Sequence, residues 1–317
     1  FSLLFGASLY LVAERAEAAG QSAARVHYSR MFWLGLFGAV HFFLIWWGDI
    51  LFMYSLAGFM ALLFLRLSPR AMLFWAIGLY ALGGLLFTGG LYFQMAVEQS
   101  GEPAAVARQM KEALNAQLDH AAALREAFSG SYADIVAANA QFNSMKLSFY
   151  PILAVVETLP LMLVGMAMYR TGFFEGYFGR SRLLRWGAAG IVVSAVWSAW
   201  LGWGAMRAGF PFYYTQYVAN GIAHLARLPM VLGYAAVLAA IAASASRGWL
   251  GARIVAAGRV AFTNYIGTSV LMMFVFQGWA LGLFGQLSRL ELLVPMVAAW
   301  AIMLAWSKPC TTLAGPW

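Results

Sequence analysis

The sequence predicts an all-α fold, a polytopic transmembrane helical bundle, and three observations support this prediction. Of the 317 residues, 63% are hydrophobic and only 10% are charged. The mean hydropathy is +0.74, and apolar runs as long as a membrane-spanning helix recur along the chain. Soluble domains carry roughly 25% charged residues. The charged residues of this chain are too few to cover a water-facing surface, and lipid must therefore solvate most of the chain.

The apolar runs predict about nine spans, because a helix that crosses the hydrocarbon core needs about 20 mainly apolar residues. Residues 31–65 form a run too long for one crossing, and we divide it at Gly48-Asp49, where a polar turn fits. The chain opens inside an apolar run, so we expect further spans upstream. We expect residues 1–317 to form a single transmembrane domain, with a partial span at 1–13 and spans near 31–47, 49–65, 71–97, 149–169, 186–204, 221–243, 259–279 and 291–307.

One segment, residues 98–148, is too polar for the bilayer. It is rich in Ala, Gln, Glu and Lys, it contains a helix-favouring stretch from Pro103 to Phe128, and a Ser-Gly-Ser break follows at 129–131. A break between two helical patterns predicts a helical hairpin outside the membrane.

The distribution of Lys and Arg predicts the orientation, because these residues gather in cytoplasmic loops. Alternate loops sort the twenty cations into thirteen on one side and seven on the other, and four of the seven belong to the long 98–148 hairpin. We therefore expect an inner-membrane protein with cytoplasmic loops at 14–30, 66–70, 170–185 and 247–258 and a cytoplasmic C-terminus. Residue 1, the 98–148 hairpin, Asp49 and the 204–220 loop are expected on the extracytoplasmic side.

The net charge of +8 follows from these basic loops, so we expect no nucleic-acid partner. Cys310 is the only cysteine, which excludes an intrachain disulfide and a cysteine-cluster metal site. The sequence has no glycine-rich phosphate loop and no His-Glu-x-x-His zinc motif, so we expect no metal. Membrane lipids and a second copy of the chain are the candidate partners.

His41 and Asp49 are the first candidates for chemistry. His41 lies about ten residues into its predicted span, near the bilayer midplane, where an ionisable group suggests a functional site. The alternative is a neutral imidazole bonded to a neighbouring helix. Asp49 follows eight residues later, so a continuous helix would hold the two about 12 Å apart and prevent direct contact. Asp49 either caps the helix that begins at Ile50 or lines the outer mouth of a cavity leading to His41.

Other polar groups lie within predicted spans. Glu157 precedes the helix-breaking Pro160 by three residues, which leaves a proton relay, an ion site and pairing with an arginine open. Thr263, Asn264 and Tyr265 cluster within one turn of an apolar helix, where such side chains usually bond across helices. Gln277 lies further along this span, and we assign no role to His224.

Five arginines in two predicted cytoplasmic loops have the chemistry to hold phosphate groups, because guanidinium forks match phosphate oxygens. The alternative is that they only satisfy the positive-inside rule and contact anionic lipid headgroups. They are Arg180, Arg182, Arg185, Arg253 and Arg259.

Several motifs resemble those of the YeiB-like family of bacterial membrane proteins, which carries a domain of unknown function. The resemblance covers nearly the whole chain and rests on Phe1 to Gly6, Gly38-x-x-His41, Trp47 to Leu51 with Tyr54 and Gly58, Leu163 to Met166, and Gly258-Arg259 with Thr263 to Tyr265. Two expected elements differ: the N-terminal Asp-x-x-Arg-Gly helix is absent, and residues 310–317 replace the expected ending.

This family is distantly similar to integral-membrane acyltransferases of the heparan-glucosaminide acetyltransferase type. The resemblance implies transfer of an acyl group from cytosolic acyl-CoA or acetyl-CoA to an extracytoplasmic or lipid-linked acceptor. It implies His41 as acyl acceptor or general base, with Asp49 or Asn264 as orienting groups. The five arginines would contact the CoA phosphates, and the substrate cavity would include Trp47, Glu157 and Tyr265.

Two other functions stay open. Glu157 beside Pro160 also fits a transporter or flippase of a small or lipid-like solute. A non-catalytic scaffold, dimeric and recruiting a partner through the 98–148 hairpin, is the third.

Overall fold

The structure is a computed structural model that describes residues 1–100 and 104–313. All regular secondary structure in these ranges is helical, which confirms the predicted all-α class. Contacts divide the chain into two compact units, the first made of residues 1–34, 53–114 and 150–242 and the second of residues 35–52, 115–149 and 243–317. Pro103 and residues 314–317, which entered the predictions above, lie outside the described residues.

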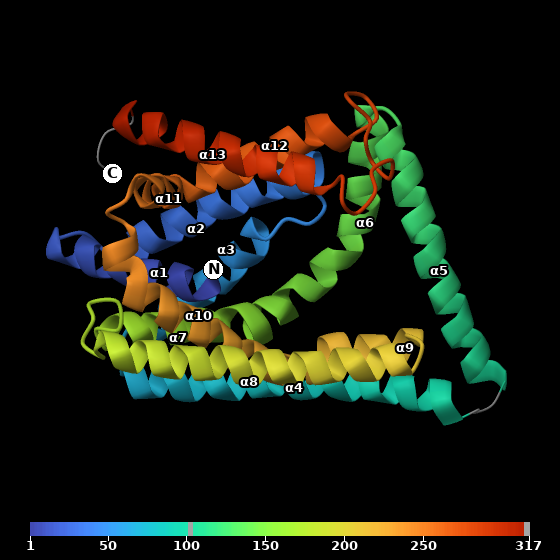
Figure 1. Cartoon of the computed structure of the whole chain (residues 1–317), viewed down its shortest axis with the longest axis horizontal. Helices are drawn as coiled ribbons and strands as arrows, with labels where there is room; N and C mark the ends of the chain where they lie inside the picture. Colours follow the sequence, from blue (N-terminus) through green and yellow to red (C-terminus); the bar gives the residue numbers. More distant parts are fainter. Residues whose placement is uncertain (101–103, 314–317) are drawn as a thin grey trace. The chain divides into compact units, whose positions relative to one another are not determined.

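The first half of the chain contains α1 (Ser2–Ala18), α2 (Ala23–Val40), the π-helical turn η1 (His41–Ile45), α3 (Leu51–Ala61), the 3₁₀ turn η2 (Leu62–Phe64), α4 (Pro69–Ser100), α5 (Ala104–Ser129) and α6 (Tyr132–Leu153). The second half contains η3 (Ala154–Thr158, π), α7 (Leu159–Arg170), α8 (Arg180–Arg207), α9 (Phe212–Gln216), η4 (Tyr217–Ile222, π), α10 (His224–Ala245), α11 (Trp249–Arg259), α12 (Ala261–Phe276) and α13 (Leu293–Leu313) (Figure 1).

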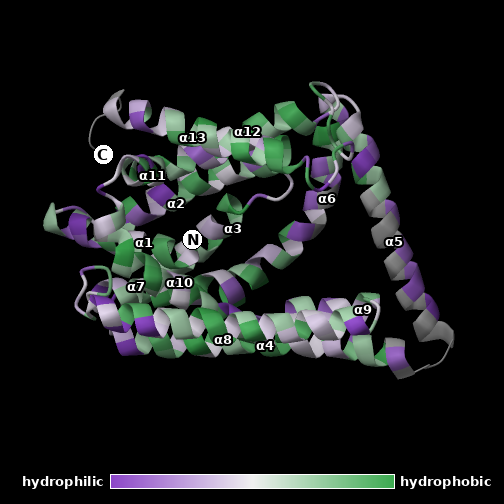
Figure 2. Cartoon of the chain, in the orientation of Figure 1, coloured by the Kyte–Doolittle hydropathy of each residue, from purple (hydrophilic) through white to green (hydrophobic). Residues whose placement is uncertain are grey.

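Helix α7 forms the core of the first unit, where it packs on α1 and α4. The candidate span that contains it, Lys146–Arg170, is 67% buried, whereas each of the other five is 22% buried or less. Gly6 of α1 and Gly165 of α7 permit this packing, because a Cβ at either position would overlap a backbone carbonyl of the other helix. The remaining spans expose long apolar faces, as expected for helices that face lipid (Figure 2).

Six helices are long and apolar enough to cross a membrane: Ala23–Ile45, Pro69–Val97, Lys146–Arg170, Arg180–Arg207, His224–Ala242 and Leu293–Thr312. The pair α11 and α12, which bend by 87° at Val260, counts as a seventh crossing only if the two helices form one broken span. The structure therefore supports a polytopic membrane protein but a lower count than the nine predicted. Helix α1, where only a partial span was predicted, has 17 residues, and the apolar stretch Leu51–Phe64 is a shorter helix, so neither is among the six.

The predicted hairpin at 98–148 exists as two helices. Helix α5 ends at Ser129 and α6 begins at Tyr132, so the break lies where the Ser-Gly-Ser sequence predicts it. Ser131 and Asp134 form a reciprocal cap, with the Ser131 N–H donating to Asp134 Oδ2 at 2.9 Å and the Asp134 N–H donating to Ser131 Oγ at 3.3 Å. Helix α6 then continues through η3 into the span that ends at Arg170, so the second arm of the hairpin leads directly into the bilayer segment.

In each unit, loops with the same predicted orientation lie together. In the first unit, Tyr169 donates to Glu14 at 2.7 Å and Arg170 donates to the carbonyl of Leu67, which joins three loops predicted to be cytoplasmic. In the second unit, Tyr132 of the predicted extracytoplasmic hairpin donates to the carbonyl of Leu44 at 2.9 Å, and Leu44 lies near the predicted extracytoplasmic end of the span 31–47. Within each unit, the contacts are thus consistent with the predicted alternation of the loops between the two sides of the membrane. Which loops face the cytoplasm stays a prediction.

Candidate functional site

The end of α2 shapes the surroundings of His41. Helix α2 begins at Ala23, eight residues before the predicted start of the span. His41 therefore lies in the last turn of this continuous helix, and its depth in the bilayer stays a prediction. The helix widens into η1 at His41, and at Trp46 the backbone becomes extended, with φ −147° and ψ 121°. Single-turn π segments are frequent at functional sites.

His41 and Asp49 are in direct contact, which corrects the prediction that they could not touch. The distance from His41 Nδ1 to Asp49 Oδ1 is 2.8 Å, and both side chains are fully buried. The prediction assumed a continuous helix, whereas the turn after Trp46 reverses the chain and brings Asp49 back to the imidazole. A buried carboxylate beside an imidazole is costly unless paired, and here each group is the other's partner.

Asp49 also caps the next helix, which confirms that part of the prediction. Its Oδ2 accepts a hydrogen bond of 2.7 Å from the N–H of Phe52, and α3 begins one residue later than expected, at Leu51. Gly38 permits this geometry, because a Cβ there would collide with the backbone of Leu51 and Phe52. The Gly38-x-x-His41 motif therefore has a structural reason: the glycine lets the start of α3 approach the helix that carries the histidine.

The hydrogen bond to Asp49 determines which imidazole nitrogen is available for chemistry. A carboxylate only accepts hydrogen bonds, so in the neutral ring Nδ1 carries the proton and Nε2 carries the free lone pair. Nε2 is buried and has no hydrogen-bond partner among the described residues. This arrangement is that of an oriented general base or nucleophile.

The other two buried histidines that the structure describes have a different environment. His27 bonds through Nε2 to the carbonyl of Gly58 at 2.7 Å, and His224 bonds through Nε2 to the carbonyl of Tyr80 at 3.3 Å and stacks on the Tyr80 ring. Both therefore have the structural role of a neutral, satisfied imidazole. The carboxylate partner distinguishes His41 from them.

Tyr265 of α12 completes the wall around His41. The two rings lie 5.0 Å apart between centroids, and the Tyr265 hydroxyl oxygen accepts a hydrogen bond of 3.3 Å from the N–H of Ile50. Tyr265 thus contacts both the imidazole and the loop that carries Asp49, in agreement with its predicted place beside the site.

The sequence analysis missed a row of polar residues on α6 that packs against the same segment. Asn143 donates to the carbonyl of Phe42 at 2.6 Å, and Lys146 donates to the carbonyl of Trp47 at 3.0 Å and lies 4.0 Å from the centre of its ring. Asn139, one turn before Asn143, is fully buried and neither amide atom has a hydrogen-bond partner among the described residues. Their spacing of four and three residues was the available signal, but 98–148 was interpreted as an extramembrane hairpin.

Asn264 lies in the same unit, and its hydrogen bonds join other helices. Its Nδ2 donates to the carbonyl of Ala257 at 3.1 Å and to Ser307 Oγ at 3.0 Å, and its Oδ1 accepts from Trp306 Nε1 at 2.7 Å. The side chain thereby connects α11 and α13 at the bend before α12. This geometry shows no hydrogen bond from Asn264 to His41.

The five arginines divide between the units, with Arg180, Arg182 and Arg185 at the start of α8 and the other two on α11. Arg253 donates to the carbonyls of Leu304 and Ala305 at 2.9 and 3.3 Å. The Ala305 carbonyl is free because Pro309, four residues later in α13, has no N–H.

Glu157 belongs to the first unit and pairs with an arginine, one of the alternatives the sequence left open. Arg227 Nη1 lies 3.3 Å from Glu157 Oε1, and the side chains are 43% and 38% exposed, respectively. Among the described residues, no group of three or more His, Cys, Asp or Glu side chains converges as a metal site would require.

The family described as "Protein of unknown function (DUF418)" matches residues 168–311. The uncharacterized protein YxaH of Bacillus subtilis (strain 168) is 28% identical over 97% of this chain and 73% of its own length. The uncharacterized protein YeiB of Escherichia coli (strain K12) is 26% identical over 97% of this chain and 75% of its own length. No solved structure matches the chain significantly. Residues 168–311 therefore belong to the DUF418 family, and the chain is a distant homologue of YeiB and YxaH over nearly its whole length.

Proposed function

We propose that this protein is a membrane-embedded acyltransferase in which His41 accepts either the acyl group or the proton of the acceptor. The donor is cytosolic acyl-CoA or acetyl-CoA, and the acceptor is extracytoplasmic or lipid-linked. The observation that carries this proposal is the buried hydrogen bond between His41 Nδ1 and Asp49 Oδ1 with Nε2 left free. The distant resemblance to acyltransferases supports it.

The hydrogen-bonded pair of His41 and Asp49 can act in either of two mechanisms, with His41 as a general base or as a nucleophile. As a general base, Nε2 takes the proton of the acceptor hydroxyl while the hydroxyl oxygen bonds to the acyl carbon and the thioester C–S bond breaks, releasing CoA as a thiolate. The resulting imidazolium is stabilised by the Asp49 carboxylate at 2.8 Å. As a nucleophile, Nε2 bonds to the acyl carbon while the C–S bond breaks and CoA leaves as a thiolate. The acceptor hydroxyl oxygen then bonds to the acyl carbon while the bond from Nε2 breaks, and Nε2 takes the hydroxyl proton.

Several buried side-chain amides without hydrogen-bond partners favour a polar molecule as the acceptor of the acyl group. Asn143 Oδ1, both amide atoms of Asn139 and Gln277 Nε2 are buried without partners among the described residues. Buried polar groups normally have a partner, and an unsatisfied one costs about 1–3 kcal/mol. A hydroxyl-rich acceptor, such as a sugar or polyol, would supply both donors and acceptors to these groups.

The direct test is acyl transfer by the purified full-length protein in liposomes supplied with radiolabelled acetyl-CoA. We expect label on the protein or on a membrane-extracted acceptor, and loss of this label in His41→Ala. His27→Ala is the matched control, because His27 is a buried histidine of the same candidate span with only a backbone carbonyl as partner. Equal loss in both folded variants, or no label and no CoA binding in the wild type, would contradict the proposal.

The proposed orientation has its own test, because Cys310 is the only cysteine. A membrane-impermeant maleimide added to intact cells should leave Cys310 unlabelled and should label it after permeabilisation. In a Cys310→Ser background, a cysteine at the exposed position Glu126 of α5 should react in intact cells. The reverse pattern would invert the topology and place the His41 end of α2 on the cytoplasmic side.

Proton-coupled transport is the second candidate, favoured by the Glu157–Arg227 pair inside candidate spans and the π-helical turns η3 and η4 beside it. Proton flux into liposomes, followed with an internal pH dye, separates the two functions. Flux that is lost in Glu157→Gln and retained in His41→Ala would favour transport.

A further inference from the structure

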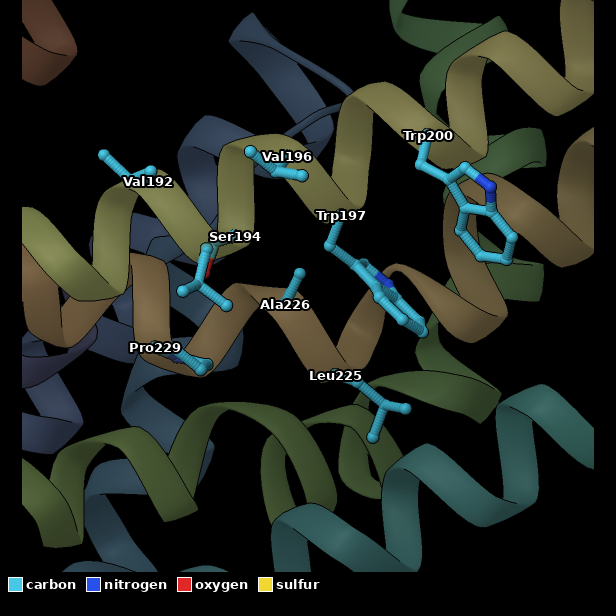
Figure 3. A pocket seen from close by; sticks show the side chains of 9 residues that line it. Val192, Ser194, Val196, Trp197, Trp200, Leu225, Ala226 and Pro229 are labelled. Atoms are coloured by element: carbon cyan, nitrogen blue, oxygen red, sulfur yellow. The ribbon is translucent and has the colours of Figure 1, made fainter.

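A continuous groove runs between α8 and α10 in the first unit. It consists of two adjoining hollows of about 710 and 690 Å³, and both hollows are lined by Val193 and Pro229. Figure 3 shows the second hollow, which is lined by Val196 and Trp197 of α8 and by Leu225 and Pro229 of α10. The groove is open on one side, and its walls are almost entirely apolar.

Glycines that line the first hollow let α8 and α10 approach each other closely. A Cβ at Gly187 would lie 2.9 Å from the carbonyl oxygen of Gly233, and a Cβ at Gly190 would lie 2.8 Å from that of Pro229. The two helix backbones therefore approach each other closely at these positions, and the side chains of Ala236 and Val237 also lie within 3.2 Å of where a Cβ at Gly187 would stand. The larger side chains of Trp186 and Leu232 also line the first hollow.

The length of the groove matches the membrane. From Arg182 to Trp200 the helix advances 18 residues, or about 27 Å at 1.5 Å per residue, close to the hydrocarbon thickness of about 30 Å. From Arg182 to Val193 it advances 11 residues, or about 16 Å, which is about the depth of one leaflet. The first hollow thus has the length of a single acyl chain.

Charge at one end identifies the chemistry of the occupant. Arg182 lines the first hollow near the N-terminal end of α8, beside the exposed Trp186. Arg180 and Arg185 lie on the neighbouring helical turns. No carboxylate lines either hollow, and none pairs with Arg182 among the described residues. An apolar trough that ends at a guanidinium suits a molecule with a long hydrocarbon chain and a phosphate head.

We infer that the groove between α8 and α10 binds an anionic phospholipid of the leaflet on the Arg182 side. One acyl chain lies in the first hollow along Gly187, Gly190 and Val193, and the phosphate contacts Arg182. None of its residues belongs to the His41 site, and Arg182, one of the five arginines that the resemblance assigns to CoA phosphates, here contacts the lipid phosphate instead.

The test is native mass spectrometry of the full chain taken from nanodiscs with equal amounts of phosphatidylglycerol and phosphatidylcholine that carry the same acyl chains. We expect the wild type to retain one phosphatidylglycerol. Arg182→Gln should lower this preference by at least about tenfold, because it removes a charge-assisted bond. Ala189→Trp should abolish retention by filling the first hollow, which Ala189 lines.

Ala188→Trp is the matched control, because Ala188 is exposed on the same turn but lines neither hollow. It should retain the lipid as the wild type does. Equal retention of both lipids by the wild type, unchanged retention in Arg182→Gln, or a lipid-free dimer that Ala189→Trp dissociates would each overturn the inference. The dimer would show that the groove binds a second copy of the chain.

Discussion

The exchange Asp49→Asn tests whether the carboxylate orients His41. The amide that replaces the carboxylate still offers one oxygen to the N–H of Phe52, so it preserves the cap that Asp49 forms at 2.7 Å. It then turns its NH₂ toward His41 Nδ1, which must become the acceptor, and the imidazole proton moves to Nε2. The exchange therefore inverts the tautomer with little change of shape.

The magnitudes follow from the hydrogen bonds that Asp49 makes with His41 and with Phe52. Replacing a charge-assisted bond with a neutral one lowers the free energy of unfolding by about 1 kcal/mol. Asp49→Ala removes the cap, about 1 kcal/mol, and the bond to the imidazole, about 1.5–3 kcal/mol, for a total of about 2.5–4 kcal/mol. The rate of acyl transfer in Asp49→Asn should fall about 10³–10⁴-fold, as for the analogous exchange in a catalytic triad.

Nitrogen NMR of the histidine rings measures directly which imidazole nitrogen of His41 carries the proton. The chain has four histidines, so ¹⁵N-histidine labelling gives a spectrum simple enough to assign with His41→Ala. We expect protonated Nδ1 and unprotonated Nε2 for His41 in the wild type and the reverse in Asp49→Asn. A wild-type His41 protonated at Nε2, or transfer activity in Asp49→Asn within threefold of the wild type, would refute the reasoning.

Two further predictions concern packing and pH. Gly165→Ala should destabilise the protein by about 3 kcal/mol or more in detergent melts, because its Cβ would overlap the carbonyl of Leu3. Gly89→Ala, with open space at its Cβ, should be neutral, and equal effects of the two variants would argue against close packing of α1 and α7. Hydrogen bonds from the side chain and backbone of Ser131 hold the pKa of Asp134 below its usual value, so the stability they add is present above the unfolded-state pKa. It should be lost as the pH falls through the lower folded-state pKa, and the hydrogen-exchange protection factors at the start of α6 should fall with acid in the wild type but not in Asp134→Asn.

The architecture was largely predictable because it depends on local properties. Apolar run length identified the bilayer segments, and the polar turn at Gly48-Asp49 and the break at 129–131 lie where expected. The span count was too high, because an apolar run shows that a segment is hydrophobic but not that it is one straight helix. Leu51–Phe64 is short, and α11 and α12 bend by 87°.

The sequence identified three candidate residues that lie together but did not predict how they contact one another. His41, Asp49 and Tyr265 were recognised as candidates, and they lie together. The contact between the first two was ruled out wrongly, because helical spacing applies only while the helix continues. Asn139 and Asn143 were missed because 98–148 was interpreted as an extramembrane hairpin, and their spacing alone does not say which segment their face packs on.

The sequence by itself determined that this chain lies in a membrane as helices, because hydrophobicity and charge are additive along the chain and require no knowledge of neighbours. It also identified His41 as a costly group in an apolar setting. Only the tertiary structure decided that Asp49 is the partner of His41, which imidazole nitrogen is free, and that glycines leave a groove between α8 and α10. Each of these features depends on where the chain turns or on which backbones meet, and close packing between distant residues determines both.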